Sequence, residues 1–290
     1  MHNRKSFYKY VPAEVAKSIL LNKTLRWSSP LLFDDRYDVT RELAADIKHS
    51  EIQLHVIDNL QQLVKHNKLP EGLNSRALIM FRLFKMAHIN NALDEIVDEL
   101  RRSNDIETHS PALSELKEIW QQWLPTYRIL CLSASNNIPL MWSKYADNHK
   151  GVVLEFACLK EFDAPWLIAK PVLYEDRPSL LNGEGWGRLL TLEQDEAVKY
   201  LFNESCYTKT TDWAYQEEWR VVSFKRAYEN TQDSYYRFYP QTLSAIYFGS
   251  EAVSVDKQNI LSLLKYDLSH VNVYSGQLLR KGAIEFVPVI

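Results

Sequence analysis

The stretch Trp213-Ala-Tyr-Gln-Glu-Glu-Trp-Arg-Val-Val-Ser-Phe224 joins a polar cluster to a run of β-branched and aromatic residues. Such a run is typical of a strand, so we expect one from Trp219 to Phe224. A strand that begins among acidic residues brings carboxylates to the edge of a sheet. This stretch therefore predicts both a sheet and a candidate site at its margin.

Gln216 and Glu218 are two residues apart. If the chain is extended there, their side chains point to one face and Glu217 points to the other. A carboxylate beside a second polar group can hold a ribose hydroxyl and stabilise an oxocarbenium-like centre by its charge. The same spacing also fits a solvated strand start with a salt bridge between Glu218 and Arg220.

The rest of the chain alternates between strand-like and helix-like segments. From about Asp38 to Trp123, apolar residues recur at helical spacing among charges, and breakers such as Pro70 and Pro111 divide this block into about four helices. Further helices are expected at 12–21, 193–207 and 255–265, and further strands at 6–11, 25–28, 127–132, 151–156, 169–174, 244–248 and 284–290. We expect an α+β fold, a single domain over 1–290 whose helical block at roughly 38–123 is inserted after the first two strands.

Composition excludes several classes of protein. The 290 residues are 46% hydrophobic and include 16 Tyr, 11 Phe and 8 Trp but 8 Gly, which argues against a disordered chain or a glycine-rich solenoid. The net charge of −3 gives no global attraction to a polyanion.

The cysteines and the apolar segments indicate a compartment. Cys131, Cys158 and Cys206 are odd in number and widely separated, which argues against a disulfide framework and a zinc site. No stretch approaches the roughly 20 apolar residues needed to cross a bilayer, and residues 1–10 lack the apolar core of a signal peptide. We expect a soluble, cytoplasmic protein without a membrane partner.

A second candidate feature is the segment Pro139-Leu-Met-Trp-Ser-Lys-Tyr-Ala-Asp-Asn-His-Lys-Gly151. On a short helix, Trp142 and Tyr145 lie at i and i+3 and form one aromatic edge on which a flat ring could stack. Aromatic residues at this spacing equally suit a core. His149 and Lys150 are interpreted as surface residues of the following turn.

Two features near the N-terminus each have a functional and a structural interpretation. Phe7-Tyr-Lys-Tyr10 places a lysine and tyrosine hydroxyls in an aromatic strand, where they could reach a ligand or only snorkel to solvent. The turn with Asp34, Asp35 and Asp38 could bind a divalent metal, with Glu42 as a further ligand. A turn that caps the next helix is the simpler interpretation, and we predict no metal site.

In their order along the chain, these segments resemble a bacterial domain-of-unknown-function family, number 2971, whose members look like distant relatives of ADP-ribosyltransferases. The matching landmarks are Phe7 to Tyr10, Leu25 to Pro30, Asp34 to Asp38, Cys131-Leu-Ser133, Met141 to Gly151 and Trp213 to Arg220. The chain departs from the family pattern at four positions, with Asp34 for Asn, Arg36 for Pro, Lys144 for His and Gln216 for Glu.

The resemblance implies an ADP-ribosyltransferase-like split sheet and NAD⁺ as the substrate. Glu218 would be the catalytic carboxylate, with Gln216 and Tyr145 completing the catalytic group. Lys9 or Tyr10 would stand where ADP-ribosyltransferases usually have His or Arg. The remaining implied NAD⁺ contacts are Ser28, Ser133, Trp142 and Arg220.

The activity implied by this resemblance is transfer of ADP-ribose from NAD⁺ to a nucleic acid or protein acceptor, or to water. Bacterial toxins and anti-phage effectors are the implied setting, with an antitoxin protein as a partner. Two alternatives stay open from the residues alone: a metal-dependent nuclease using Asp34, Asp35 and Asp38, and a non-catalytic module that binds a nucleotide or a partner. The helical block could dock a partner or select a substrate.

Overall fold

The computed structural model describes residues 2–279 and 284–289, except 36, 40–42, 44–46, 68–71, 103–110 and 179. It confirms a mixed α+β fold. Arg36, Glu42 and Pro70 lie outside the described residues.

The chain forms two compact units. Unit 1 comprises residues 1–34, 125–173 and 211–290, and unit 2 comprises residues 35–124 and 174–210. The expected helical block thus shares a compact unit with a segment 50 residues further along the chain.

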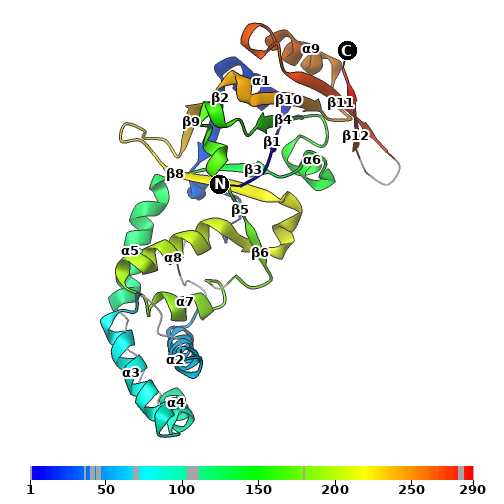
Figure 1. The fold of residues 1–290 in the computed structure, drawn as a ribbon. Coiled ribbons are helices and arrows are strands. Elements are labelled where there is room, and N and C mark those ends of the chain that lie inside the picture. Colours follow the sequence, from blue (N-terminus) through cyan, green and yellow to red (C-terminus); the bar gives the residue numbers. More distant parts are fainter. Residues whose placement is uncertain are drawn as a thin grey trace. The chain divides into compact units, whose positions relative to one another are not determined.

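Unit 1 is built on an open sheet that is mostly antiparallel (Figure 1). The strand order is β12-β11-β10-β4-β1-β3-β2-β9, and β8 lies on the other side of β3 with β5 beyond it. Only the β10–β11 pair is parallel among the described pairs. The strands are β1 Ser6–Val11, β2 Thr24–Ser28, β3 Tyr127–Ser133, β4 Val152–Ala157, β5 Lys170–Pro171, β8 Glu218–Phe224, β9 Asp233–Arg237, β10 Leu243–Phe248, β11 Asn272–Leu278 and β12 Ile284–Pro288.

Strand β3 joins two parts of this sheet. It pairs with β8 over seven residues, from Tyr127 to Ser133. Its other edge is shared: Ser133 pairs with Tyr8 of β1, and Ile129 pairs with Ser28 of β2. Strand β1 is otherwise paired with β4 over its whole length. The sheet is therefore loosely joined between β1 and β3.

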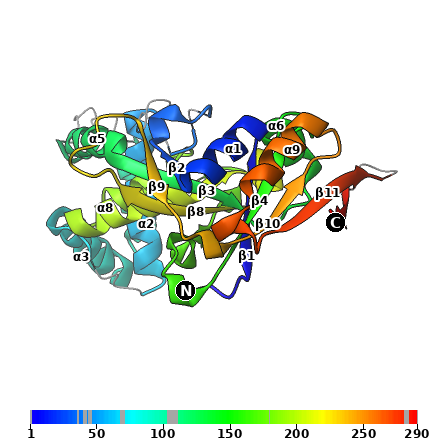
Figure 2. The same ribbon diagram turned by 90° about the horizontal axis from the view of Figure 1, so that it is seen from above.

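Helices cover both faces of the sheet of unit 1. The helices α1 (Ala13–Asn22) and α9 (Ser254–Leu263) lie side by side, and their buried residues share a core with Phe7, Leu154 and Phe156 (Figure 2). Tyr10 and Val153, which alternate with those residues, instead share a core with α6 (Pro139–Tyr145). Side-chain alternation places the two cores on opposite faces.

Unit 2 is mainly helical. Its helices are α2 His49–Lys65, α3 Ser75–Ile89, α4 Leu93–Arg102, α5 Pro111–Trp123, α7 Glu184–Leu189 and α8 Gln194–Tyr207. Helices α2, α3 and α4 bury one shared apolar core. Gly187 lets α7 approach α2 closely, because a Cβ there would lie 2.4 Å from the carbonyl carbon of His55. The short strands β6 (Leu173–Glu175) and β7 (Thr208–Thr210) pair with each other.

In the described residues, no helix has both the length and the apolar character that a bilayer crossing requires.

Candidate functional site

Glu218 is the first residue of β8 and lies opposite Ser133 of β3. Its carboxylate accepts two hydrogen bonds from Arg220, Nε to Oε1 at 2.7 Å and Nη2 to Oε2 at 3.0 Å. Their side chains are 7% and 0% exposed. A bidentate arginine bond fixes both the position and the plane of a carboxylate. The Glu218–Arg220 salt bridge of the alternative interpretation is thus present, but it is buried rather than solvated.

Gln216 does not lie on a strand, which corrects the expectation of an extended chain. It ends the 3₁₀ helix η5 (Thr211–Gln216), and Glu217 follows with φ of 43°. This left-handed residue turns the chain into β8, and hydrogen bonds of its main chain to Ala134 and Ala214 hold the turn. Gln216 and Glu218 are nevertheless both buried, and Glu217 is exposed.

Gln216 is joined to α6 through Tyr145. Its Nε2 atom donates to the Tyr145 hydroxyl at 2.7 Å, and 36% of Tyr145 is exposed. Trp142 lies one helical turn earlier, with no exposed surface, and its Nε1 donates to the carbonyl of Asn136 at 2.7 Å. Of the two predicted stacking rings, Tyr145 is therefore the one that a ligand can reach.

Lys9 and Cys131 lie beside the Glu218–Arg220 pair. Lys9 Nζ donates to the main-chain oxygen of Cys131 at 2.8 Å, where β1 and β3 are loosely joined. Burial lowers the pKa of Lys9, although Glu218 and Cys131 act in the opposite direction. Burial, with the negative charge of Glu218 and a hydrogen bond to it, raises the pKa of the Cys131 thiol to about 12. A carboxylate, a guanidinium, a buried lysine amine and a thiol thus meet near the sheet junction.

Two more predicted site residues have structural partners. The Tyr10 hydroxyl donates to the carbonyl of Ser135 at 2.9 Å and accepts from the main-chain nitrogen of Ile138 at 3.2 Å. Burial raises the pKa of this tyrosine above its ordinary value. The Ser133 hydroxyl donates to the carbonyl of Gln216 at 2.8 Å. Both side chains hold the segments that surround Tyr145 and Glu218.

Ser28 is the last residue of β2, in register with Ile129 and Asp233. No described hydrogen bond joins its side chain to Glu218. The segment that follows does reach the site, because the Arg220 guanidinium lies 5.5 Å from the centre of the Phe33 ring.

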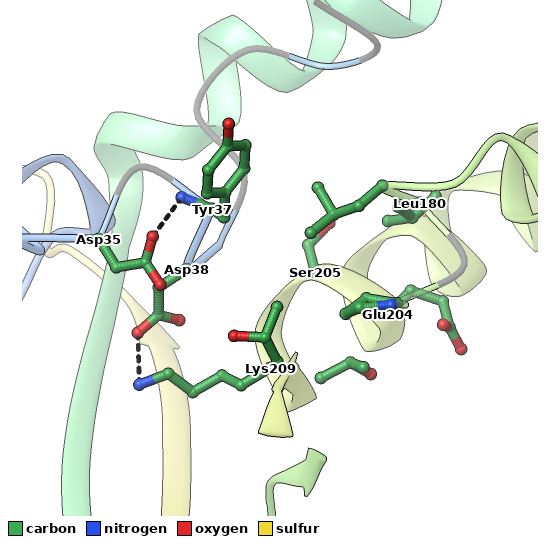
Figure 3. Close-up of a pocket in the computed structure, with 11 residues that line it drawn as sticks. Asp35, Tyr37, Asp38, Leu180, Glu204, Ser205 and Lys209 are labelled. Carbon is green, nitrogen blue, oxygen red and sulfur yellow. Dashed lines mark hydrogen bonds and ion pairs between the residues drawn. The ribbon is translucent and has the colours of Figure 1, made fainter. Parts of the chain in front are cut away.

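The acidic turn has a different environment, within unit 2 for Asp35 and Asp38. Asp35 accepts a hydrogen bond from the main-chain nitrogen of Tyr37 at 2.9 Å, and Asp38 pairs with Lys209 at 2.9 Å (Figure 3). The Asp38–Lys209 pair is buried beside a pocket with a cavity volume of about 10 Å³, room for roughly one water molecule. No group of three potential metal ligands occurs in the described part of the chain. The ion pair with the buried Lys209 holds Asp38 of this turn in place.

Three residues of this region have contacts that the sequence patterns do not predict. Cys131, part of the Cys131-Leu-Ser133 landmark, is in register with Arg220 and by alternation shares a face with Ser133. Lys144 Nζ donates to the Tyr215 hydroxyl at 3.1 Å and lies 5.3 Å from the centre of the Trp213 ring. His149, interpreted as a surface residue, is half-buried and stacks on Trp142.

Comparison with known proteins gives a match to part of the chain. No curated protein and no solved structure matches the chain. Residues 141–221 match the family model described as "Protein of unknown function (DUF2971)", and the matched residues include Trp142, Tyr145, Gln216, Glu218 and Arg220. Over the segment that carries most of the candidate site, the chain is therefore similar to this family.

Proposed function

We propose that this protein is an NAD⁺-dependent ADP-ribosyltransferase whose catalytic carboxylate is Glu218. One observation carries the proposal. Glu218 is fixed at the start of β8, beside Lys9 of β1 and Cys131 of β3, and the preceding Gln216 is hydrogen-bonded to Tyr145 of α6. Residues that are far apart in the sequence thus surround one carboxylate.

The chemistry of this group suits cleavage of a glycosidic bond. An ionised carboxylate can accept about four hydrogen bonds, and Glu218 accepts two from Arg220 and one from the Cys131 thiol. Glu218 would accept a hydrogen bond from a ribose hydroxyl of NAD⁺ and stabilise positive charge on the anomeric carbon as the bond to nicotinamide breaks. The accessible Tyr145 ring would flank the nicotinamide.

Arg220 and Lys9 have a separate role in this proposal. The Arg220 guanidinium and the Lys9 amine are hydrogen-bond donors beside the carboxylate, and such donors suit the diphosphate of NAD⁺. A nucleophile from a protein or a nucleic acid would then attack the anomeric carbon and take the ADP-ribose. The setting that the resemblance implies is a bacterial toxin or an anti-phage effector, with an antitoxin as partner.

The test is incubation of the purified protein with labelled NAD⁺ and cell lysate, followed by separation of protein and nucleic acid. We expect label in one fraction, free nicotinamide, and loss of both in Glu218→Gln. Glu217→Gln is the matched control, because it changes the adjacent, exposed carboxylate, and it should retain activity.

A second variant covers the case in which Glu218→Gln fails to fold. Tyr145→Phe removes one hydroxyl from a partly exposed side chain, and it should fold and lose activity because Gln216 loses a partner. NAD⁺ binding without nicotinamide release would indicate a binding module and overturn the proposal. Full activity in both folded variants would also overturn it.

A further inference from the structure

Helix α3 of unit 2 has an outer apolar face that the described structure does not cover. Its inner face, Ala77, Phe81, Phe84 and Ala87, is buried against α2 and α4. On the outer side, Ile79, Leu83 and Met86 are 59%, 59% and 62% exposed. Soluble proteins rarely leave a continuous row of large apolar side chains in water unless it meets a partner.

The row has the spacing of a helix-pairing seam. Ile79, Leu83 and Met86 follow one another at intervals of four and three residues, which is the pattern of a coiled-coil face. At 3.6 residues per turn they lie within about 60° of the helix circumference, and Ile89, 71% exposed at the end of the helix, widens the exposed apolar face to about 120°. The row itself suits one partner helix, with Ile89 at its margin.

The charges on α3 indicate the sign of the partner. The helix contains no Asp or Glu, and it carries Arg76, Arg82 and Lys85. Within the described residues, none of these three cations forms an ion pair. Charged residues that flank a coiled-coil seam choose the partner by complementarity.

A second copy of the chain fits this face poorly. Two α3 helices would bring like charges together. Helix α4 is acidic, but among its large apolar residues Ile96 is the exposed one, at 38%, so it offers no matching row.

We infer that the α3 seam, Ile79, Leu83 and Met86 with its flanking cations, docks an acidic amphipathic helix of a partner protein. Pairing along this seam needs about two heptads, or roughly 20 Å of partner helix. The inference does not depend on the activity proposed for Glu218.

The test uses a fluorescent synthetic helix of three heptads with Leu and Ile at the seam and Glu beside it, and measures binding to the full chain by anisotropy. We expect saturable binding that weakens with salt, and a loss of at least about tenfold in Leu83→Asp. Leu21→Asp, on α1, is the matched control, since Leu21 is 66% exposed and belongs to unit 1 rather than unit 2. Met86→Glu replaces Leu83→Asp if the latter does not fold by circular dichroism.

A second peptide tests whether binding requires acidic residues in the partner helix. A peptide with Lys in place of Glu should bind poorly to the wild type and should bind better to Arg82→Glu. Equal binding of both peptides, or no effect of Leu83→Asp, would overturn the inference. So would binding of phosphatidylserine vesicles without peptide binding, or a dimer that Leu83→Asp disrupts, because these identify a membrane or a second copy as the occupant.

Discussion

The Glu218–Arg220 pair is a buried charge pair made by two residues of one strand. Removing one member of such a pair leaves the other charge buried and uncompensated. Arg220→Met should therefore lower the free energy of unfolding by about 3–5 kcal/mol in urea titrations.

Arg26→Met is the control for this prediction. Arg26 forms an exposed ion pair with Asp233 at 3.2 Å, and such pairs contribute at most about 1 kcal/mol. Equal losses of unfolding free energy in Arg220→Met and Arg26→Met would show that the buried pair stabilises the fold no more than the surface pair.

Cys131 gives a chemical readout of Glu218. With a pKa of about 12, roughly one thiol in ten thousand is ionised at pH 8, and the thiolate is the reactive form. Iodoacetamide should therefore modify Cys131 very slowly in the folded protein and rapidly in urea. Glu218→Gln removes a negative charge that raises this pKa, so modification should accelerate in the folded variant.

Peptide mass spectrometry measures the rate at Cys131 itself. Alkylation at the urea rate in the native wild type would contradict the raised pKa. An unchanged rate in folded Glu218→Gln would show that the carboxylate does not act on the thiol.

At the scale of elements, the turn at Glu217 joins η5 to β8 through one left-handed residue. A left-handed φ costs a residue with a side chain about 1–2 kcal/mol, and glycine avoids most of this cost. Glu217→Gly should raise the free energy of unfolding by up to about 1 kcal/mol, and Glu217→Val should lower it by at least about 1 kcal/mol.

Asp212→Gly tests whether the gain is specific to the left-handed residue. Asp212 is exposed in η5, and glycine there should cost roughly 0.5 kcal/mol. A higher free energy of unfolding in both Glu217→Gly and Asp212→Gly would contradict the explanation by backbone strain.

Elements with strong local patterns were predictable. The runs of apolar and β-branched residues gave β1, β3, β4 and β10 within one or two residues, and helical spacing with Pro and Gly breakers gave the helices of the 38–123 block. Strands β9 and β11 were missed. The first is polar, and the second contains Ser275 and Gly276, so its place in the sheet depends on pairing with β10 and β12.

At the scale of the whole molecule, the half-buried Tyr247 and the buried Tyr10 link stability to alkaline pH. Burial raises the pKa of Tyr247, and its hydroxyl donates to Glu155 at 2.6 Å; the pKa of Tyr10 is raised as well. Above about pH 10 the unfolded chain loses these protons and the folded protein keeps them. Stability should therefore fall as the pH rises beyond 10.

Urea unfolding between pH 8 and 11.5 measures this fall. Tyr247→Phe should make it shallower, whereas Tyr266→Phe should not, because Tyr266 is 93% exposed. The same slope in both variants would contradict the role of Tyr247.

The candidate site was only partly predictable because it assembles over long sequence distances. Glu218, Gln216 and Tyr145 could be chosen from local patterns and from the family resemblance. The position of Lys9 beside Cys131 depends on pairing between strands 122 residues apart, which no local pattern encodes. The grouping of residues 174–210 with 35–124 is non-local in the same way.

The interleaving of the two units has a consequence for biosynthesis. All of unit 2 has left the ribosome once residue 210 has cleared the exit tunnel, so this unit can fold while translation continues. Unit 1 must wait for residues 211–289, which bring β8 and Glu218 to a β3 strand made some 85 residues earlier. The nascent chain thus acquires its α3 seam before the strand that carries Glu218, and a partner could engage the seam before unit 1 is complete.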